Sequence, residues 1–260
     1  MGVLNITPDS FYDGGKYKDE ASILKQAEKL LDEGATFVDL GAYSSRPGAT
    51  DVSEKEELKR ILPVVDLLIS NFPDIYLSID TFRSGVARRC LENGAAMIND
   101  ISAGNMDPNM MQTISDFKVP YIMMHMKGNP QNMSKQTNYS KLLEDVLYYF
   151  SEKVALAKSF GINDIILDPG FGFAKTPSQS FSLLHHLNLF KTFGLPILVG
   201  LSRKSMIYKT LGINPSQALN GTTALNSFAL SKGANILRVH DVKEAVECIE
   251  LIQAVNQIED

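Results

Sequence analysis

Short apolar runs alternate along the chain with segments whose apolar side chains recur at helical spacing. The runs occupy residues 1–5, 37–40, 75–79, 96–98, 121–124, 165–168, 197–200 and 236–239. Each run is only a few residues long and ends at a polar residue or a turn former, a pattern typical of parallel strands buried on both faces. The sequence therefore predicts eight strands with a helical segment between most of them.

Helix signals mark many of the intervening segments. Residues 19–33 place apolar side chains on one face and stop at Gly34, and Ser53 with Glu56 predicts a capping box for a helix that continues to residue 70. Further helices are expected over 84–93, from Asp107-Pro108, up to Phe160, from Thr176-Pro177, over 216–231 and after Asp241.

This alternation in 260 residues predicts one closed (β/α)8 barrel, a TIM barrel in the α/β class, that spans residues 1–260 as a single domain. The hydrophobic fraction of 44% suffices for one large core. The alternative is a doubly wound open sheet, which the sequence favours less because the alternation continues through eight units.

Composition narrows the function. The net charge of -5 and a pI near 5.5 argue against nucleic acid or an anionic membrane as a partner. No apolar run is long enough to span a bilayer, and no signal peptide precedes the first run. Cys90 and Cys248 fall within helical patterns without metal-type spacing, which predicts reduced thiols in a cytoplasmic protein.

Polar residues stand at or next to the ends of the predicted strands. They are Asn5, Asp39, Asp80, Asn99, His125, Asp168, the segment 202–204 and the segment 238–240. In a barrel these ends meet at one face, where such folds carry their active sites.

Taken singly, several of these residues have a purely structural interpretation. Asp39 could cap its own loop, and Asn99 could bond a neighbouring backbone group. His125, between two methionines, is best interpreted as a buried core histidine with its hydrogen bonds satisfied. The number that converge nevertheless favours a ligand site, because buried polar groups cost stability unless they are paired.

Residues 165–176, IILDPGFGFAKT, are the most informative stretch. Asp168 ends the strand, the glycines at 170 and 172 let backbone approach a ligand, and Phe171 and Phe173 offer flat apolar faces. The stretch is not a dinucleotide or phosphate loop, because it lacks the third glycine and a Gly-Lys-Ser/Thr sequence.

The residue types indicate the chemistry of the ligand. Ionised Asp80 and Asp168 accept hydrogen bonds, and Asn99 both donates and accepts, a set that matches a flat heterocycle with an N–H edge and a carbonyl. The histidines do not pair at zinc-enzyme spacing, so a dedicated zinc site is not expected. A local positive region, which suits an anionic group, comprises Arg46, Lys204, Arg238 and His240.

Eight motifs together resemble the dihydropteroate synthases of folate biosynthesis over essentially the whole chain. They are MGVLNITPDSFYDGG at 1–15, SSRPGA at 44–49, SIDT at 78–81, INDISAG at 98–104, MHMKG at 124–128, LDPGFGFAKT at 167–176, GLSRKSMI at 200–207 and RVHD at 238–241. Each is only suggestive alone, but their order, each at a strand end, is highly specific.

The resemblance implies a barrel that joins 6-hydroxymethyl-7,8-dihydropterin pyrophosphate to p-aminobenzoate and releases pyrophosphate. It further implies Mg2+ as cofactor, a homodimer, and membership of an enzyme family that sulfonamides target. The pterin site would comprise Asp80, Asn99, Met124, Asp168, Phe173, Gly200 and Lys204, and the pyrophosphate site Asn5, Arg238 and His240, with Asn5 on the metal. The aminobenzoate site would comprise Ser45, Arg46, Pro47, Phe173 and Ser202, and the catalytic residues Asp80, Asp168, Lys204, Arg238 and His240.

No covalent nucleophile is expected, because the arylamine is itself nucleophilic. Ser44, Ser45 and Ser202 show no paired histidine and acid in the sequence. The loops at 6–18 and 41–52 are expected to close over the substrates and exclude water.

The sequence departs from the family pattern in two places. Residues 42–45 read Ala-Tyr-Ser-Ser where Gly-Glu-Ser-Thr is more usual. Family members usually carry residues before the first strand that close the barrel floor. Here residue 1 already belongs to that strand, so the segment is missing from this sequence or the floor closes otherwise.

Two alternative functions remain at this point. A pterin-dependent methyltransferase barrel would share the pterin pocket, but it gives no reason for the Ser-Arg-Pro-Gly and Arg-Val-His motifs. A non-catalytic pterin-binding subunit would have no need of the anion-binding cluster.

Overall fold

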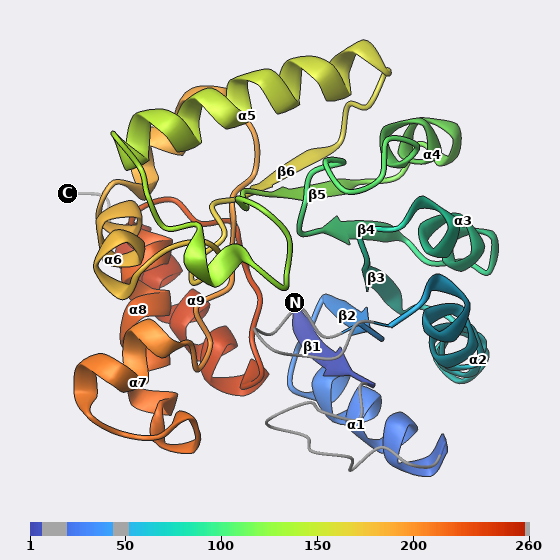
Figure 1. Cartoon of the computed structure of the whole chain (residues 1–260). Coiled ribbons are helices and arrows are strands. Elements are labelled where there is room, and N and C mark those ends of the chain that lie inside the picture. The colour runs from blue at the N-terminus through green and yellow to red at the C-terminus, as the bar shows by residue number, and fades with distance from the viewer. Residues whose placement is uncertain (7–19, 44–51, 258–260) are drawn as a thin grey trace.

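The computed structural model of the chain describes residues 1–6, 20–43 and 52–257, and in this part eight parallel strands form a barrel (Figure 1). The strands are β1 (Gly2–Asn5), β2 (Phe37–Gly41), β3 (Tyr76–Asp80), β4 (Met97–Asp100), β5 (Tyr121–Met124), β6 (Ile165–Asp168), β7 (Leu198–Val199) and β8 (Ile236–Leu237). Their buried side chains explain the apolar runs in the sequence.

The order of pairing closes the barrel. Strands β1 to β6 pair in sequence order, and β7 pairs with β8. Two parallel bridges complete the ring, Leu167 to Ile197 between β6 and β7, and Gly2 to Val239 between β8 and β1. The barrel prediction is therefore confirmed, and the open-sheet alternative is wrong.

Helices surround the strands on the outside of the barrel (Figure 1). They are α1 (Glu20–Asp32), α2 (Glu54–Asn71), α3 (Ser84–Glu92), α4 (Met110–Phe117), α5 (Leu142–Ser159), α6 (Pro177–His185), α7 (Ser205–Leu211), α8 (Leu219–Ser231) and α9 (Val242–Asn256). Short 3-10 helices cover Met133–Lys135, Leu187–Phe193 and Pro215–Gln217. The sequence analysis did not predict α7, which is seven residues long and too short for a periodic signal.

The starts of three predicted helices differ in detail from the caps that their sequences suggest. Ser53 accepts from the Glu56 backbone N–H as predicted, but the Glu56 side chain binds Arg60, so the capping box is incomplete. Asp107 does not cap α4 directly, because it accepts instead from the backbone N–H groups of Ser84 and Asn109.

Asp241 precedes α9 without a capping bond from its side chain, which binds Arg203. The capping box at Thr176 and Gln179 is complete, and Pro177 opens α6 as predicted. Both cysteines are free and buried, as expected.

The apolar interior has three parts. The largest lies between strands and helices and includes Leu4, Leu40 and Phe150. A second lies at the first residues of several strands, at the floor of the barrel, where Met97, Ile122, Ile166 and Leu198 contact Met1, Phe37 and Ile236.

The third cluster lies at the opposite end, beside the strand termini that carry the polar residues. It comprises Tyr43, Phe82, Ile101, Met124, Met126, Met133 and Ala174. Apart from Met124, the last residue of β5, these residues come from the loops after β2 to β6, so the loops support one another through apolar contacts.

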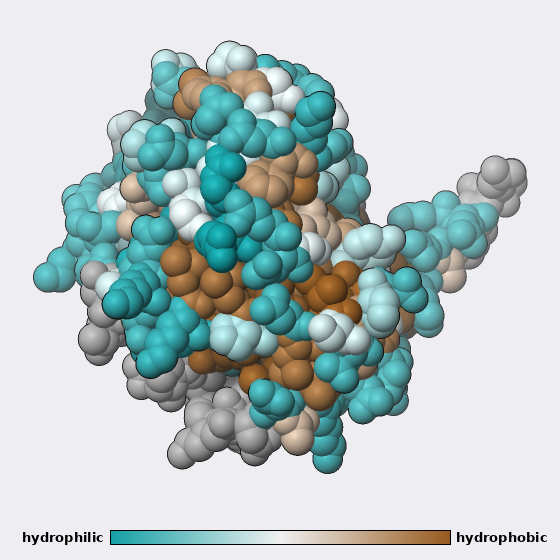
Figure 2. All heavy atoms as spheres, turned by 90° about the vertical axis from the view of Figure 1, so that its right-hand side faces the viewer, coloured by the Kyte–Doolittle hydropathy of each residue, from teal (hydrophilic) through white to brown (hydrophobic). Residues whose placement is uncertain are grey.

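On the outer surface, Figure 2 shows polar side chains over much of the face that carries α2, α3 and α4, with apolar side chains visible in the furrows between them. Among the described helices, none has the length and hydropathy of a membrane span.

Candidate active site

The strand pairing brings the predicted polar residues to one end of the barrel. In the register of β1 to β4, Asn5 lies beside Gly41, Gly41 beside Asp80, and Asp80 beside Asn99. Further along the sheet, Met124 at the end of β5 lies beside Asp168 at the end of β6. The C-terminal ends of the strands thus form the face at which barrels carry their active sites.

Arg238, just after β8, connects two carboxylates across the barrel. Its Nε donates to Asp39 Oδ2 at 2.5 Å, and its Nη2 donates to Asp80 Oδ2 at 2.9 Å. Asp39 is fully buried and also accepts from Ser78 Oγ at 2.6 Å and from Asn99 Nδ2 at 3.1 Å. The interpretations of Asp39 as a loop cap and of Asn99 as a backbone partner are therefore wrong.

Asp80 lies in a setting that moves its titration to neutral pH. Burial raises the pKa of Asp80 to about 7, and although Arg238 opposes this, the neighbouring carboxylates Asp39, Glu57 and Asp100 add to it. A ligand that donates a hydrogen bond or carries positive charge would favour the ionised form.

Asp168 is buried at the end of β6, and Oδ1 accepts from the Gly170 N–H at 2.8 Å. Burial raises the pKa of Asp168, while Lys204 and the Gly170 N–H act in the opposite direction. Gly170 has φ of +71°, and a Cβ there would lie 2.2 Å from the carbonyl oxygen of His125. The loop after β6 therefore requires glycine at this position.

Lys204 lies between the loop after β6 and the end of β7. Its Nζ donates to the carbonyl oxygen of Phe171 and lies 4.6 Å from the centre of the Phe173 ring. A Cβ on Gly200 would lie 3.8 Å from Lys204 Nζ and 4.0 Å from Arg238 Cβ, so Gly200 separates the two cationic side chains. Burial lowers the pKa of Lys204 to about 8 against the effect of Asp168.

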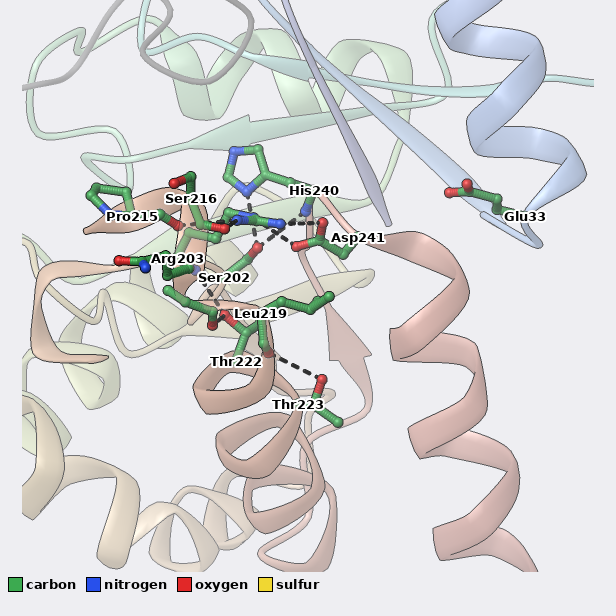
Figure 3. A network of polar contacts seen from close by, with 12 residues as sticks. Glu33, Ser202, Arg203, Pro215, Ser216, Leu219, Thr222, Thr223, His240 and Asp241 are labelled. Carbon is green, nitrogen blue, oxygen red and sulfur yellow. Dashed lines mark hydrogen bonds and ion pairs between the residues drawn. The ribbon is translucent and has the colours of Figure 1, made fainter. Parts of the chain in front are cut away.

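Ser202 and His240 form a pair next to this cluster (Figure 3). Ser202 Oγ lies 2.9 Å from His240 Nδ1 and accepts from the His240 backbone N–H at 3.2 Å. Oγ has a second lone pair and one hydrogen, so in this contact the hydroxyl donates to Nδ1 or accepts from it according to the tautomer of the ring. The sequence showed no histidine and acid paired with Ser202, and of the two the structure supplies the histidine. The adjacent Asp241 binds Arg203 and does not complete a triad.

Arg203 holds this pair in place (Figure 3). Its Nε and Nη2 donate to the two oxygens of Asp241 at 2.8 and 2.7 Å, and its Nη1 donates to the carbonyl oxygens of Pro215 and Ser216. Its backbone N–H donates to Thr222 Oγ1 at 3.0 Å. The sequence analysis included Arg203 only in a cationic motif, but here it joins the loop after β7 to the start of α9.

Lys175 is a buried residue that the sequence analysis did not select. Its Nζ lies 2.8 Å from His125 Nδ1 and contacts three backbone carbonyl oxygens. Burial and the charge of Lys175 lower the pKa of His125 to about 2, so the imidazole is neutral. The prediction of a buried, satisfied His125 is confirmed. The only sequence signal for Lys175 was its place next to the loop.

The structure places the other predicted residues as follows. Met124 is buried at the end of β5, and Phe173 is half-buried beside Lys204. Ser45, Arg46 and Pro47 of the predicted aminobenzoate site lie outside the described residues, as does Ser44. All other predicted site residues belong to the connected set around Arg238 and Lys204 or directly adjoin it.

The fit of a Mg2+ ion is tested by the oxygen atoms around Gly41. A Cβ on Gly41 would lie 3.3 Å from Asn5 Oδ1 and 3.7 Å from Asp80 Oδ2, so an amide and a carboxylate oxygen border one small space. Within the described residues, no cluster of three or more His, Cys, Asp or Glu side chains is arranged to bind a metal. This donor set suits Mg2+, which commonly takes one or two protein oxygens and completes its shell with water and phosphate.

Comparison with known proteins identifies the family. The model of the family described as pterin binding enzyme matches residues 1–240. The dihydropteroate synthase of Escherichia coli strain K12 is 42% identical over 256 residues, which cover 98% of this chain and 90% of that protein. The dihydropteroate synthase of Synechocystis is 43% identical over 258 residues, which cover 98% of this chain and 89% of that protein.

Solved structures agree. A Yersinia pestis dihydropteroate synthase in a complex with a sulfonamide drug superimposes with a TM-score of 0.95 at 41% identity, over 99% of this chain and 94% of that one. The Xanthomonas albilineans dihydropteroate synthase in complex with 7,8-dihydropteroate gives 0.88 at 34% identity, over 100% and 94%. The chain therefore belongs to the pterin-binding enzymes and, within them, to the dihydropteroate synthases, which are transferases of folate biosynthesis.

Proposed function

We propose that the residues at this end of the barrel bind the two halves of one substrate separately. The acidic side chains would bind its pterin ring, and the cationic side chains would bind its diphosphate. The reaction joins 6-hydroxymethyl-7,8-dihydropterin pyrophosphate to p-aminobenzoate and yields 7,8-dihydropteroate and diphosphate. The main support for this proposal is the arrangement around Arg238. Its guanidinium donates hydrogen bonds to the carboxylates of Asp39 and Asp80, and its side chain lies near Lys204 on the other side of Gly200.

The pterin half would lie between Asp168, Asn99 and Lys204, with Asp80, Met124, Phe173 and Gly200 around it. The Asp168 carboxylate would accept from the N–H edge of the ring. Because Asn99 gives an amide N–H to Asp39, its amide oxygen is the atom directed to a second ring N–H. Lys204 would donate to the ring carbonyl.

The diphosphate half would meet Arg238 and His240. Two of the five guanidinium N–H groups are used by Asp39 and Asp80, which leaves donors for phosphate oxygens. The His240 ring, whose Nδ1 lies 2.9 Å from Ser202 Oγ, would supply a further donor to the phosphate through an imidazole N–H. Asn5 would hold a Mg2+ ion, which, when bound, neutralises charge on the leaving diphosphate.

The residues then favour the transfer by position and charge. The bond between the pterin methylene carbon and the phosphate oxygen breaks with its electron pair on the departing diphosphate, whose charge Arg238 and His240 bind. The negative charges of Asp80 and Asp168 would stabilise the positive charge that develops on the pterin methylene. The arylamine nitrogen bonds to that carbon and releases one proton, so no covalent enzyme intermediate is needed.

The aminobenzoate would lie against Phe173 and Ser202, together with Ser45, Arg46 and Pro47, which lie outside the described residues. A sulfonamide would compete for the same place, as the sulfonamide complex of the Yersinia pestis enzyme suggests. We further propose a cytoplasmic homodimer. The exposed side chains of Phe228 on α8 and of Leu251 and Val255 on α9 favour an apolar interface there, and sedimentation equilibrium would test it.

The activity test measures diphosphate release from the two substrates with Mg2+ present. We expect turnover that needs both substrates, and a large loss in Asp168→Asn, which keeps the shape but loses the charge that faces the ring. Turnover of methyltetrahydrofolate would instead support the methyltransferase. Tight pterin binding without diphosphate release would support the binding subunit.

A further inference from the structure

Lys175 contacts the loop of the proposed pterin pocket through the carbonyl oxygens of Gly170 and Phe173. We propose that Lys175 is a positioning residue that fixes residues 170–174 in the shape required for pterin binding. The inference rests on the proposed assignment of Asp168, Phe173 and Lys204 to that pocket.

The contacts of Lys175 account for all of its hydrogen-bonding capacity. The side chain is 7% exposed, and Nζ lies 2.8 Å from His125 Nδ1. Nζ also lies 3.1 Å from the carbonyl oxygens of Gly170 and Phe173, and 3.3 Å from that of His125. In its protonated form the group has three N–H donors, and the four acceptors around it leave none of these donors unsatisfied.

The loop needs such a group because its backbone folds back on itself. Gly170 lies directly against the His125 carbonyl, Phe173 N–H donates to the Gly170 oxygen at 3.1 Å, and Ala174 has φ of +49°. The carbonyl oxygens of His125, just after β5, and of Gly170 and Phe173 in the turn therefore point to one spot. Oxygens gathered in this way repel one another and lose hydration, unless a cation or donor lies between them.

Two contacts connect the conformation of the loop to the pocket. Phe173 gives its carbonyl oxygen to Lys175 and turns its ring to Lys204, whose Nζ lies 4.6 Å from the ring centre. Phe171, two residues earlier, gives its carbonyl oxygen to Lys204. Both lysines therefore bind the same loop, and a change at Lys175 would displace the groups that orient Lys204 and stack beside the pterin.

His125 completes the arrangement as a neutral acceptor. Its ring is enclosed by aromatic side chains, with the Tyr149 ring 4.8 Å and the Phe150 ring 6.4 Å away between centres. Its Nδ1 lone pair faces Lys175, and its backbone N–H donates to the Asp168 carbonyl at 2.9 Å. The histidine thus ties the end of β5 to the lysine and the loop, which gives it a role outside the chemistry.

The test compares Lys175→Met, which keeps length but removes all donors, with Lys127→Met as the matched control. Lys127 lies two residues after His125, and its Nζ donates to the Asn138 carbonyl at the surface. We expect the dissociation constant for 6-hydroxymethylpterin, measured by calorimetry, to rise at least about tenfold in Lys175→Met and to stay unchanged in Lys127→Met. Amide hydrogen exchange in residues 169–175 should accelerate only in the former.

A purely structural role predicts a different result. Loss of folded enzyme would lower the apparent kcat in proportion to the inactive fraction, while the pterin affinity of the remaining molecules stayed at the wild-type value. That outcome, with loop exchange unchanged, would overturn the inference.

If Lys175→Met does not fold, Lys175→Gln keeps two N–H donors and should raise the dissociation constant by an intermediate factor. An unchanged constant in Lys175→Gln would equally overturn the inference. Asp168→Asn separates this inference from the site assignment. Wild-type pterin binding by Asp168→Asn would contradict the pocket itself, whereas loss there with retention in Lys175→Met would contradict only the role of Lys175.

Discussion

At the scale of single residues, the site depends on buried charges, which destabilise the folded protein unless they are paired. Asp39 is fully buried and is satisfied by three donors, from Ser78, Asn99 and Arg238. Arg238 in turn links Asp39 to Asp80. Asp39 therefore determines the position of the Arg238 guanidinium, although Asp39 itself has no need to contact the substrate. Buried pairs of this kind add little net stability when intact, but breaking one leaves an uncompensated charge.

Asp39→Asn tests this role. The amide keeps the shape but removes the charge that balances Arg238, so we expect the free energy of unfolding in urea to fall by about 3 kcal/mol. Asp116→Asn, which weakens an exposed ion pair with Arg88, serves as control and should change stability little. Equal, small effects at both positions would show that Asp39 is not needed to balance Arg238.

At the scale of elements, the loops after β7 and β8 act together through Arg203 (Figure 3). Its φ of +54° is uncommon for a residue with a side chain, and five hydrogen bonds hold it there. Ser202 and Lys204 flank Arg203 directly, and its bound partner Asp241 follows His240. The geometry of the diphosphate site therefore depends on Arg203, whose side chain binds the residue next to His240.

Arg203→Met should loosen that geometry. We expect the inhibition constant of inorganic diphosphate to rise by about tenfold, the equivalent of one lost charge-assisted hydrogen bond. Arg203→Lys should not restore the wild-type value, because an ammonium group cannot reproduce the two-pronged contact with Asp241. Arg88→Met, at an exposed pair, is the control. Full rescue by lysine would show that charge alone matters.

The sequence predicted the elements more completely than the contacts among them. Apolar runs closed by Asp80, Asp168 or Asn5 are local signals, and their placement on one face follows from the barrel alone. The partners of Arg238 could not be predicted, since Asp39 is 199 residues away in the chain. Lys175 was missed because three of its four acceptors are backbone carbonyls, which carry no signature in the sequence. Helix α7 was missed because it is too short for periodicity.

At the scale of the whole molecule, the site opposes stability near neutral pH. Burial lowers the pKa of Lys175 to about 7 and that of Lys204 to about 8, both from an ordinary value of 10.5. Between these values and 10.5, the unfolded chain binds more protons than the folded protein. Raising the pH through this window therefore disfavours unfolding.

We accordingly expect the free energy of unfolding to gain a positive contribution from these lysines between pH 7 and 9, with a slope of at most about 1.4 kcal/mol per pH unit for each. Urea unfolding of the wild type and of Lys204→Met at pH 7, 8 and 9 measures it, since the variant lacks one titrating group. A steeper rise in Lys204→Met than in the wild type would contradict the assigned pKa shift.

The central claim is that Asp168, Asn99 and Lys204 form one pocket that holds the flat ring of the pterin. The most direct measurement is a crystal structure of the protein with bound 6-hydroxymethylpterin. The account predicts ring N–H groups within hydrogen-bond distance of the Asp168 carboxylate and the Asn99 amide oxygen, with Lys204 at the ring carbonyl. A pterin bound elsewhere, with these three side chains in contact only with protein and water, would contradict it.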